Sequence, residues 1–572
     1  MYDILIQNGI IVDGTGNPWY RADIGIRAGK IVEVARKGIS ASSGKHIIDA
    51  SGLAVAPGFC DLHTHSDFSI LWHRHARSSI HAGVTTEAVG QCGTGAYAFA
   101  DGYQQAVVMD MLPYTNTDPT QVTVDWRRLG EWREKVELNG TGVNIAPYVA
   151  HGTIRNSVMG VEGQGGERYE PTAEEMDKMI ALVREAMEDG AFGLSTGLRY
   201  PWGRNSYTEE VIELCKVVKE YGGLYISHMR SEEDALIEAA AELIRICEEA
   251  GVRGSMSHHK AVFMENWGKP AETMRMIDRA RQRGVDVMCD FYPWTHAAEG
   301  NLGQLFLQHL IGPDTSLDQI MSLLGNLPGV IQDPETWQKI RKGAIEGFAR
   351  ETEANEQRKV VLAKHGVTAP DLWDPARFHY LVRSERHPDV EGRNLGEIAR
   401  LWGMEDYLEV ARKLYTDDEG STMTAGGIMS EDDIITILKH PTSAISTDGA
   451  AFDQAWDLSN PVAWAHPRNY GSYAKVLQRY VREMKIISLE EAVRKMTSLP
   501  LGFLGIKDRG LVKEGFWADV TIFDPQRVEN KADYHNPCVY PHGIQYVLVN
   551  GQVALDDGSH TDVLAGKVLK RQ

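Results

Sequence analysis

The sequence predicts an α/β protein built on a (β/α)8 TIM-like barrel, with a small β-sandwich domain made from both chain ends. Through the middle of the chain, eight short apolar segments alternate with helical ones, which is typical of parallel β/α units that close into a barrel. The two ends of the chain instead alternate in strand fashion around turns such as Asn-Gly and Ala-Gly-Lys, which indicates hairpins.

The eight barrel strands are assigned to apolar runs that end in polar residues. Amphipathic helices, with apolar residues at helical spacing, precede several of these runs, as at 172–190 and 232–251. We place the strands in residues 52–63, 82–90, 142–152, 190–197, 222–228, 251–258, 284–293 and 442–449.

The same pattern predicts the domain organisation. We expect residues 1–52 and 506–572 to form the β-sandwich, 53–300 to hold barrel strands 1 to 7, and 441–505 to hold strand 8 and the final helices. Residues 301–440 are mostly helical in pattern and too long for one βα connection. They are expected to form a helical insertion between strands 7 and 8, either a lid over the carboxyl end of the barrel or a surface for oligomer assembly.

Charge and composition exclude several classes of partner. The net charge of −20 argues against nucleic acid and against an anionic membrane, because both require a basic face. The first residues carry neither a basic leader nor a cleavable apolar core, and no apolar run is long enough to span a bilayer. The cysteines are sparse and show no framework spacing, so we expect free thiols and a cytoplasmic location; they are Cys60, Cys92, Cys215, Cys247, Cys289 and Cys538.

Residues with metal-binding side chains follow several of the predicted strands. His63 and His65 are two residues apart, so at the end of a strand both imidazoles leave on the same side. In a closed barrel all strand ends meet at one mouth, where imidazoles, a thiol and a carboxylate make a zinc-type ligand set. A pair of hydrogen-bonded core histidines is the structural alternative. The residues at the strand ends are His63, His65, Cys92, His151, Ser195, Thr196, His228, His258, Asp290 and Asp448.

The motifs around these residues resemble the amidohydrolase superfamily, and within it the D-aminoacylases, or N-acyl-D-amino-acid deacylases. They are PGFCDLHTHSD (57–67), AGVTTEAVGQCGTG (82–95), YISHMRSE (225–232), MSHHKAV (256–262), ISTDGA (445–450) and HPRNYGSY (466–473), with the tail at 496–525. Hydantoinases and dihydroorotases, as families, bridge two metals with a carboxylated lysine on strand 4. Residues 190–197 contain no lysine, so the resemblance implies that the thiolate of Cys92 takes that place.

The resemblance also implies which residues bind zinc. His228, His258 and Cys92 would hold one ion tightly, and His63, His65, Cys92 and Asp448 would form a second, weaker position. Cys92 could instead be an inert buried thiol and Asp448 a turn residue. His259 is expected to face away from the metal.

By the same resemblance, Asp448 is expected to act as the general base for a zinc-activated water. His151 or Tyr200 would stabilise the oxyanion. Lys260, Arg468 and Tyr200, with Arg230 as a further candidate, would bind a substrate carboxylate, for which an arginine fork is well shaped.

We therefore predict a zinc-dependent hydrolase of N-acyl-D-amino acids, or of related N-acyl amino acids and D-peptide amides, as small-molecule substrates; the sequence does not fix the D or L configuration. The alternatives are a cyclic-amide hydrolase or deaminase of the same superfamily, hydantoinase-like or dihydroorotase-like, and a non-catalytic barrel. The resemblance implies small hydroxyl residues near positions 296 and 299, where this chain has His296 and Glu299, which could reshape the acyl pocket. The number of metal ions and assembly into a homo-oligomer are left open.

Overall fold

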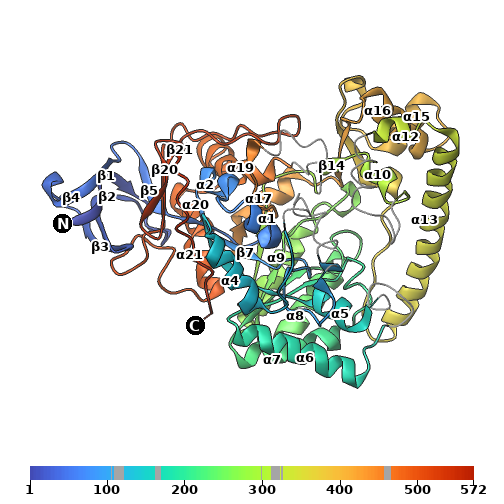
Figure 1. The fold of residues 1–572 in the computed structure, drawn as a ribbon, viewed down its shortest axis with the longest axis horizontal. Coiled ribbons are helices and arrows are strands. Elements are labelled where there is room, and N and C mark those ends of the chain that lie inside the picture. Colours follow the sequence, from blue (N-terminus) through green and yellow to red (C-terminus); the bar gives the residue numbers. More distant parts are fainter. Residues whose placement is uncertain are drawn as a thin grey trace.

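A computed structural model describes residues 1–571 except 105, 108–121, 161–168, 298, 311–322, 324–325 and 456–465. Eight parallel strands form the predicted barrel at the centre of the molecule (Figure 1). Strand 3 is in two pieces on either side of Tyr148, each paired with one neighbour. The barrel strands are β6 (Phe59–Asp61), β7 (Val84–Val89), β8 (Asn144–Pro147) with β9 (Val149–Ala150), β10 (Gly193–Gly197), β11 (Leu224–His228), β12 (Arg253–Met256), β13 (Val287–Phe291) and β17 (Ser443–Ile445).

The barrel closes between its first and last strands. Thr64 and Gly449 form a parallel bridge, and the Asp448 N–H donates to the His63 carbonyl at 3.0 Å. Leu224 and Ile226 pack into the apolar interior. His228 lies on the same face of β11 at its carboxyl end, because every second residue of a strand points the same way. The barrel is thus apolar inside and carries its chemistry at one rim.

Helices cover the outside of the barrel and bury apolar stripes against it. The predicted helix over 172–190 is α6 (Ala173–Glu188), which begins at a capping box between Thr172 and Glu175. The other covering helices are α1 (Ser66–Trp72), α2 (Arg77–His81), α4 (Leu129–Asn139), α5 (His151–Met159), α7 (Thr208–Glu220), α8 (Leu236–Ala250), α9 (Pro270–Gln282), α17 (Glu431–Lys439), α19 (Arg468–Lys475), α20 (Leu489–Met496) and α21 (Ser498–Leu504).

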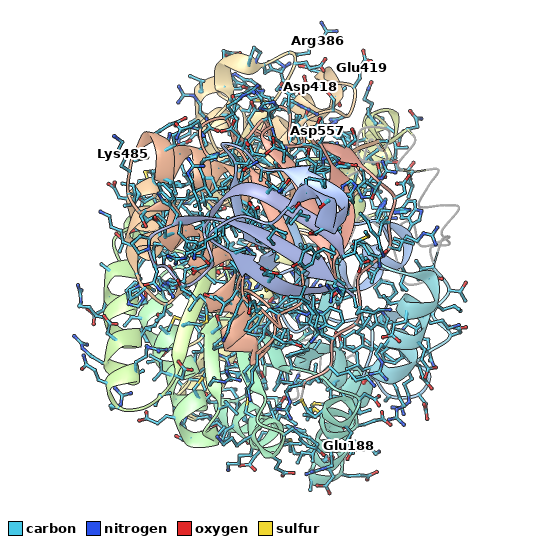
Figure 2. The ribbon with its side chains drawn as sticks, turned by 90° about the vertical axis from the view of Figure 1, so that its left-hand side faces the viewer. Glu188, Arg386, Asp418, Glu419, Lys485 and Asp557 are labelled. Atoms are coloured by element: carbon cyan, nitrogen blue, oxygen red, sulfur yellow. The ribbon has the colours of Figure 1, made fainter. Side chains whose placement is uncertain are left out.

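Strands from both chain ends form one sheet beside the barrel, on the left in Figure 1 and in front in Figure 2. The β-sandwich is thus one continuous nine-stranded sheet, within the described residues, that encloses its own apolar core. Its strands are β1 (Tyr2–Ile11), β2 (Tyr20–Arg27), β3 (Lys30–Ala35), β4 (Gly44–Asp49), β5 (Ala54–Pro57), β18 (Val520–Phe523), β19 (Ile544–Val549), β20 (Gln552–Asp556) and β21 (Ser559–His560).

The single strand predicted over 52–63 is wrong. Residues 54–57 pair with β1 and β18 in the end sheet, and only residues 59–61 join the barrel. Gly58 separates the two pieces, and a Cβ there would lie 2.2 Å from the Thr85 hydroxyl oxygen. The apolar run therefore serves two sheets in succession.

The insertion between β13 and β17 is not only helical. Its helices have their own apolar core, and three short strands form an antiparallel sheet that was not predicted. At the far end of the insertion, α17 packs against α9 and leads into β17, so this helix covers the barrel. The elements are β14 (Glu299–Asn301), α10 (Gln304–Leu307), α12 (Leu327–Val330), α13 (Pro334–Ala363), α14 (Pro375–Phe378), β15 (His379–Arg383), α15 (Leu395–Trp402), α16 (Tyr407–Asp417) and β16 (Met423–Gly426).

The structure also bears on the expectations about membrane-spanning segments and free thiols. Among the described residues, no helix combines the length and the apolar character needed to cross a bilayer. All six cysteines are buried free thiols.

Candidate active site

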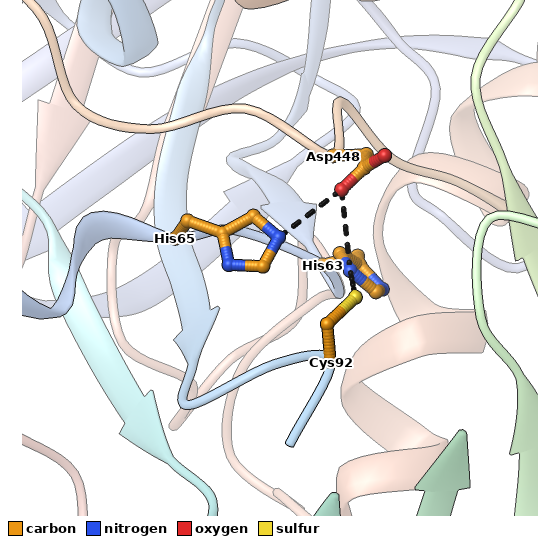
Figure 3. A group of neighbouring side chains, drawn as sticks. All are labelled: His63, His65, Cys92 and Asp448. Atoms are coloured by element: carbon orange, nitrogen blue, oxygen red, sulfur yellow. Dashed lines mark hydrogen bonds and ion pairs between the residues drawn. The ribbon is translucent and has the colours of Figure 1, made fainter. Parts of the chain in front are cut away.

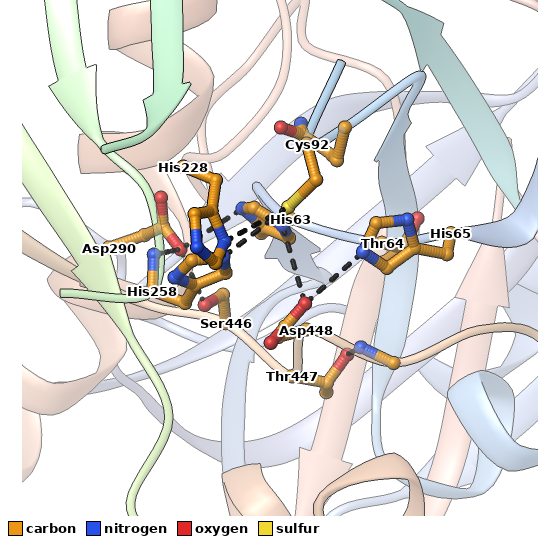
Figure 4. A network of polar contacts seen from close by, with 12 residues as sticks. His63, Thr64, His65, Cys92, His228, His258, Asp290, Ser446, Thr447 and Asp448 are labelled. Atoms are coloured by element: carbon orange, nitrogen blue, oxygen red, sulfur yellow. Dashed lines mark hydrogen bonds and ion pairs between the residues drawn. The ribbon is translucent and has the colours of Figure 1, made fainter. Parts of the chain in front are cut away.

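Cys92, His228 and His258 come together at the carboxyl end of the barrel (Figure 4). The Cys92 Sγ lies 3.3 Å from His258 Nε2 and 3.8 Å from His228 Nδ1. The two ring nitrogens are 2.8 Å apart. All three side chains are almost completely buried. The loop after β7 and the ends of β11 and β12 thus place one sulfur and two nitrogens around a common point.

A second group shares Cys92 and adds His63, His65 and Asp448 (Figure 3). The Oδ1 atom of Asp448 lies 3.4 Å from His63 Nε2 and 3.2 Å from His65 Nε2. His63 Nε2 lies 3.4 Å from the Cys92 sulfur. The two groups therefore form one continuous cluster, with the thiol between them.

The chemistry of the donors fits zinc. A tetrahedral ion with bonds of about 2.0 Å to nitrogen and 2.3 Å to sulfur sets its donors about 3.3–3.6 Å apart. The sulfur–nitrogen separations in the first group bracket this spacing, while the two nitrogens are closer together than it requires. Burial lowers the pKa of His228 and of His258, so both rings are neutral, as metal ligands must be.

Cys92 could act as a thiolate ligand only with a cation beside it. Burial, and then the nearby carboxylate of Asp448, raise the pKa of Cys92 well above its ordinary value. Alone, this side chain would stay protonated and inert. A cation beside it would provide the counter-charge that a thiolate requires.

The backbone at three of these residues adopts a left-handed conformation. The φ angles are +53° at Cys92, +32° at His258 and +51° at Asp448. Non-glycine residues rarely hold such angles unless the surroundings fix them, and such positions concentrate at functional sites. At Cys92 the fixing contact is Gly197 of β10, where a Cβ would lie 2.0 Å from the Cys92 carbonyl oxygen. The backbone of β10, the fourth barrel strand, thus approaches this site closely, and the strand supplies no lysine.

Two acidic residues lie beside the ring nitrogens of His63 and His258 that face away from Cys92. Asp290, at the end of β13, accepts hydrogen bonds from the His258 N–H and the Ser446 hydroxyl, both at 2.9 Å, and lies 3.5 Å from His63 Nδ1. Glu232 Oε1 lies 2.9 Å from His258 Nδ1. A carboxylate on the far nitrogen of a ligand histidine fixes its tautomer and orientation.

A cavity of about 250 Å³ opens beside this cluster. Lys260 lines it and donates to Glu232 Oε1 at 2.6 Å, with its Nζ 2.8 Å from His258 Nδ1. Arg468 also lines it and donates from Nη1 to Asp448 Oδ2 at 2.7 Å. The ring of Tyr292 lies between the two cations, 5.3 Å from Lys260 Nζ and 5.0 Å from the Arg468 guanidinium carbon.

The remaining predicted substrate residues are not all in the cavity. Tyr200 lines it, with its ring centroid 4.4 Å from that of His228. The structure corrects the expectation that His151 and Arg230 lie in the substrate cavity, because neither is among the described residues that line it. His151 Nε2 is 2.7 Å from Glu210 Oε1. Arg230 donates to both carboxylate oxygens of Glu242 at 2.9 Å. Both are held in buried structural pairs.

Three other residues from the sequence prediction lie around the site. His259 turns to Thr273, with Nε2 2.6 Å from the hydroxyl oxygen. The His296 ring packs on Tyr534, with 4.8 Å between centroids, and its neighbour Ala297 lines the cavity in its place. Glu299 begins β14, and its side chain lies outside the described part of the structure.

Sequence reasoning missed several residues that the structure brings to the site. Glu232 is four positions after His228, and Tyr292 is two positions after Asp290, so strand periodicity could have found Tyr292. Trp373 and Phe378 of the insertion also line the cavity. No local signal marks these two, because only the fold of the insertion places them there.

Comparison with known proteins identifies a matching family and relatives of similar sequence. The amidohydrolase family model matches residues 46–315 and 406–555. The chain is 31% identical to an N-acyl-D-glutamate deacylase of Alcaligenes xylosoxydans xylosoxydans, over 100% of this chain and 96% of the relative. It is 30% identical to a D-aminoacylase of the same organism, over 100% and 98%.

A solved structure matches as well. It is the N-acyl-D-glutamate deacylase of Bordetella bronchiseptica, complexed with zinc and a phosphonate inhibitor that mimics the tetrahedral intermediate. The identity is 30%, the alignment covers 100% of this chain and 99% of that one, and the TM-score is 0.72. The family model spans the barrel and the rim residues on both sides of the insertion. The chain belongs to the amidohydrolase family.

Proposed function

We propose that the protein is a zinc-dependent deacylase that hydrolyses the amide bond of N-acyl-D-amino acids. One observation carries the proposal: each cation of the cavity directly contacts a member of the metal-type cluster. Arg468 contacts Asp448, and Lys260 contacts His258. A carboxylate bound by these cations would hold its neighbouring amide at the cluster. The D configuration is taken from the named activities of the relatives.

Cys92, His228 and His258 would hold the tight zinc ion, and His63, His65 and Asp448 would form a weaker second position with Cys92. Zinc, when bound, lowers the pKa of water to about 7 and polarises a carbonyl group. Zinc in the Bordetella bronchiseptica structure supports this choice of metal.

The protein's own side chains would position the substrate and move its proton. Asp448 would accept the proton of the attacking water and deliver it to the departing amine nitrogen. Lys260, Arg468 and Tyr292 would grip the carboxylate. Tyr200, whose ring packs on His228 at the cavity wall, would border the acyl carbonyl.

The geometry gives less support to the alternatives. A cyclic amide without a free carboxylate would give Lys260 and Arg468 no substrate carboxylate to bind. A non-catalytic barrel would not explain why the donors converge while three of them hold left-handed backbone angles. Six buried thiols fit a reducing, cytoplasmic setting.

The test is a substrate panel with metal analysis. The purified, zinc-loaded chain is assayed with N-acetyl-D- and N-acetyl-L-amino acids, hydantoin, dihydropyrimidines and nucleobases, and zinc is quantified by mass spectrometry. We expect turnover of the D series and at least one zinc ion per chain. Turnover of the rings alone, or no zinc in the active protein, would overturn the proposal.

A further inference from the structure

The insertion contributes an aromatic wall to the cavity. Trp373 and Phe378, on either side of the start of α14, stack with their ring centroids 4.3 Å apart and an interplanar angle of 12°. Both rings line the cavity together with Ala297, and Phe452 lines it as well. We refer to Trp373 and Phe378 as the aromatic pair.

The barrel rim fixes the Trp373 half of the aromatic pair. The Trp373 indole N–H donates to Glu233 Oε1. The Arg199 guanidinium carbon lies 4.6 Å from the Trp373 ring centroid, and its Nε lies 3.6 Å from Glu233. Arg199 also donates to the Asp371 carbonyl at 2.9 Å. These contacts tie the insertion to loops after β10 and β11, so Trp373 is part of a built wall.

Phe378, the second residue of the aromatic pair, is held by contacts within the insertion. A Cβ at Gly426 would lie 2.2 Å from the Phe378 ring, so the ring can sit there only because residue 426 has no side chain. The Gly427 N–H donates to the Phe378 carbonyl at 2.9 Å. Gly426 of β16 thus leaves the space that the Phe378 ring fills, and Gly427 holds its backbone by a hydrogen bond.

The aromatic pair stands beside the carboxylate grip. Glu232 holds Lys260, and the next residue, Glu233, holds Trp373. The aromatic pair also packs on the apolar cluster that contains Tyr292. In an amino acid the side chain is attached to the same carbon as the carboxylate. The acyl group begins one bond farther away, beyond the amide nitrogen, so we assign a wall next to the carboxylate grip to the side chain of the substrate.

In the proposed binding mode, both cations among the described residues that line the cavity bind the carboxylate next to the scissile amide. These cations are Lys260 and Arg468, and each is paired with an acid. An acidic side chain bound against the aromatic pair would lose its hydration without gaining an ion pair, which is strongly unfavourable.

We propose that this site selects N-acyl-D-amino acids with apolar, and best with aromatic, side chains, and that it rejects N-acyl-D-glutamate and N-acyl-D-aspartate. Trp373 and Phe378 are the specificity-determining residues. The inference rests on the proposed deacylase function and names the substrate class of that site. The relatives, at 31% and 30% identity, act by name on D-glutamate and on D-amino acids generally, so similarity does not decide the class.

The first experiment compares kcat/KM of the zinc-loaded enzyme for the N-acetyl derivatives of D-phenylalanine, D-leucine, D-alanine and D-glutamate. We expect D-phenylalanine to exceed D-glutamate by at least about 100-fold, since a site rejects a group that it leaves unpaired by such factors. An equal or higher value for D-glutamate or D-aspartate would overturn the inference while leaving the deacylase function intact. No turnover of any N-acyl-D-amino acid would overturn both.

The second experiment tests the aromatic pair. Trp373→Ala and Phe378→Ala should each lower the ratio of kcat/KM for D-phenylalanine over D-alanine by about 10-fold, mainly through KM. Phe348→Ala, on the exposed face of α13, is the matched control and should leave the ratio unchanged. Trp373→Phe should restore most of it. A second series varies acyl length on D-alanine. If the variants change the acyl series and not the side-chain series, the assignment of the wall is overturned.

Discussion

Arg468 and Asp448 form a buried ion pair, with Nη1 of the guanidinium 2.7 Å from Oδ2 of the carboxylate. The other oxygen of Asp448 faces His65 and His63. Burial alone would raise the pKa of Asp448, but Arg468 and the surrounding histidines hold it well below its ordinary value. The carboxylate is therefore ionised, which is the form in which a general base acts, and Arg468 has further N–H groups that could bind a substrate.

Asp448→Asn should lower kcat by about 100- to 10,000-fold, which is the contribution of a positioned general base. The tight metal group does not include Asp448, so zinc should stay bound at one equivalent. Steady-state kinetics and zinc quantitation on the same preparation check both parts. Full activity in this variant would remove Asp448 from the reaction.

Arg468→Met should raise KM by about 10- to 100-fold, because a hydrogen bond between charged groups contributes about 1.5–3 kcal/mol. The rise in KM should be confined to substrates with a free carboxylate, whereas a change in kcat through Asp448 should appear with every substrate, so an N-acyl-D-amino acid amide serves as the comparison. Arg479→Met is the matched control, since Arg479 pairs with Glu431 on the outside of the barrel. An equal loss on both substrates would show that Arg468 acts only through Asp448.

Glu232→Gln should weaken zinc binding by about 10- to 100-fold and raise KM as well. The carboxylate contacts both a ligand histidine and Lys260, and removing such a partner typically costs this much metal affinity. Competition with a chelator measures the affinity without relying on activity. Glu248→Gln, which changes a surface pair with Arg283, should alter neither quantity. Unchanged zinc affinity in Glu232→Gln would mean that this carboxylate does not orient His258.

Stability should fall as the pH drops from about 6.5 toward 4, in part because of His81. Burial, with help from His560 and Arg77, lowers the pKa of His81 to about 4 in the folded protein. Between the two values the unfolded chain binds the proton and the folded chain does not, so the folded state loses up to about 3 kcal/mol.

His81→Phe isolates this contribution. The ring of His81 stacks on Tyr540 with centroids 3.9 Å apart, and phenylalanine keeps that stack but cannot titrate. Denaturant unfolding between pH 6.5 and 4 should show a slope reduced by about one bound proton. His46→Phe, at an exposed position in β4, is the control. A slope equal to that of the parent protein would assign the acid sensitivity to other groups.

The barrel and its converging rim could be predicted because each strand carries its own signal: an apolar run that ends at a polar residue. The structure places His63, His65, Cys92, His228, His258 and Asp448 together; their roles as ligands stay predictions. The sequence could not show that His151 and Arg230 pair with Glu210 and Glu242, because only the packing of the covering helices against the barrel brings these acids to them. Nor could it show Trp373 at the cavity, since the insertion reaches the rim only through its tertiary fold.

The most direct test of the account is the position of the metal. Crystals of the zinc-loaded protein, with diffraction recorded on both sides of the zinc absorption edge, locate the ion without reference to activity. We predict an anomalous peak within about 2.0–2.4 Å of Cys92 Sγ, His228 Nδ1 and His258 Nε2. A fully loaded crystal whose zinc lies elsewhere, with these three side chains left uncoordinated, would contradict it.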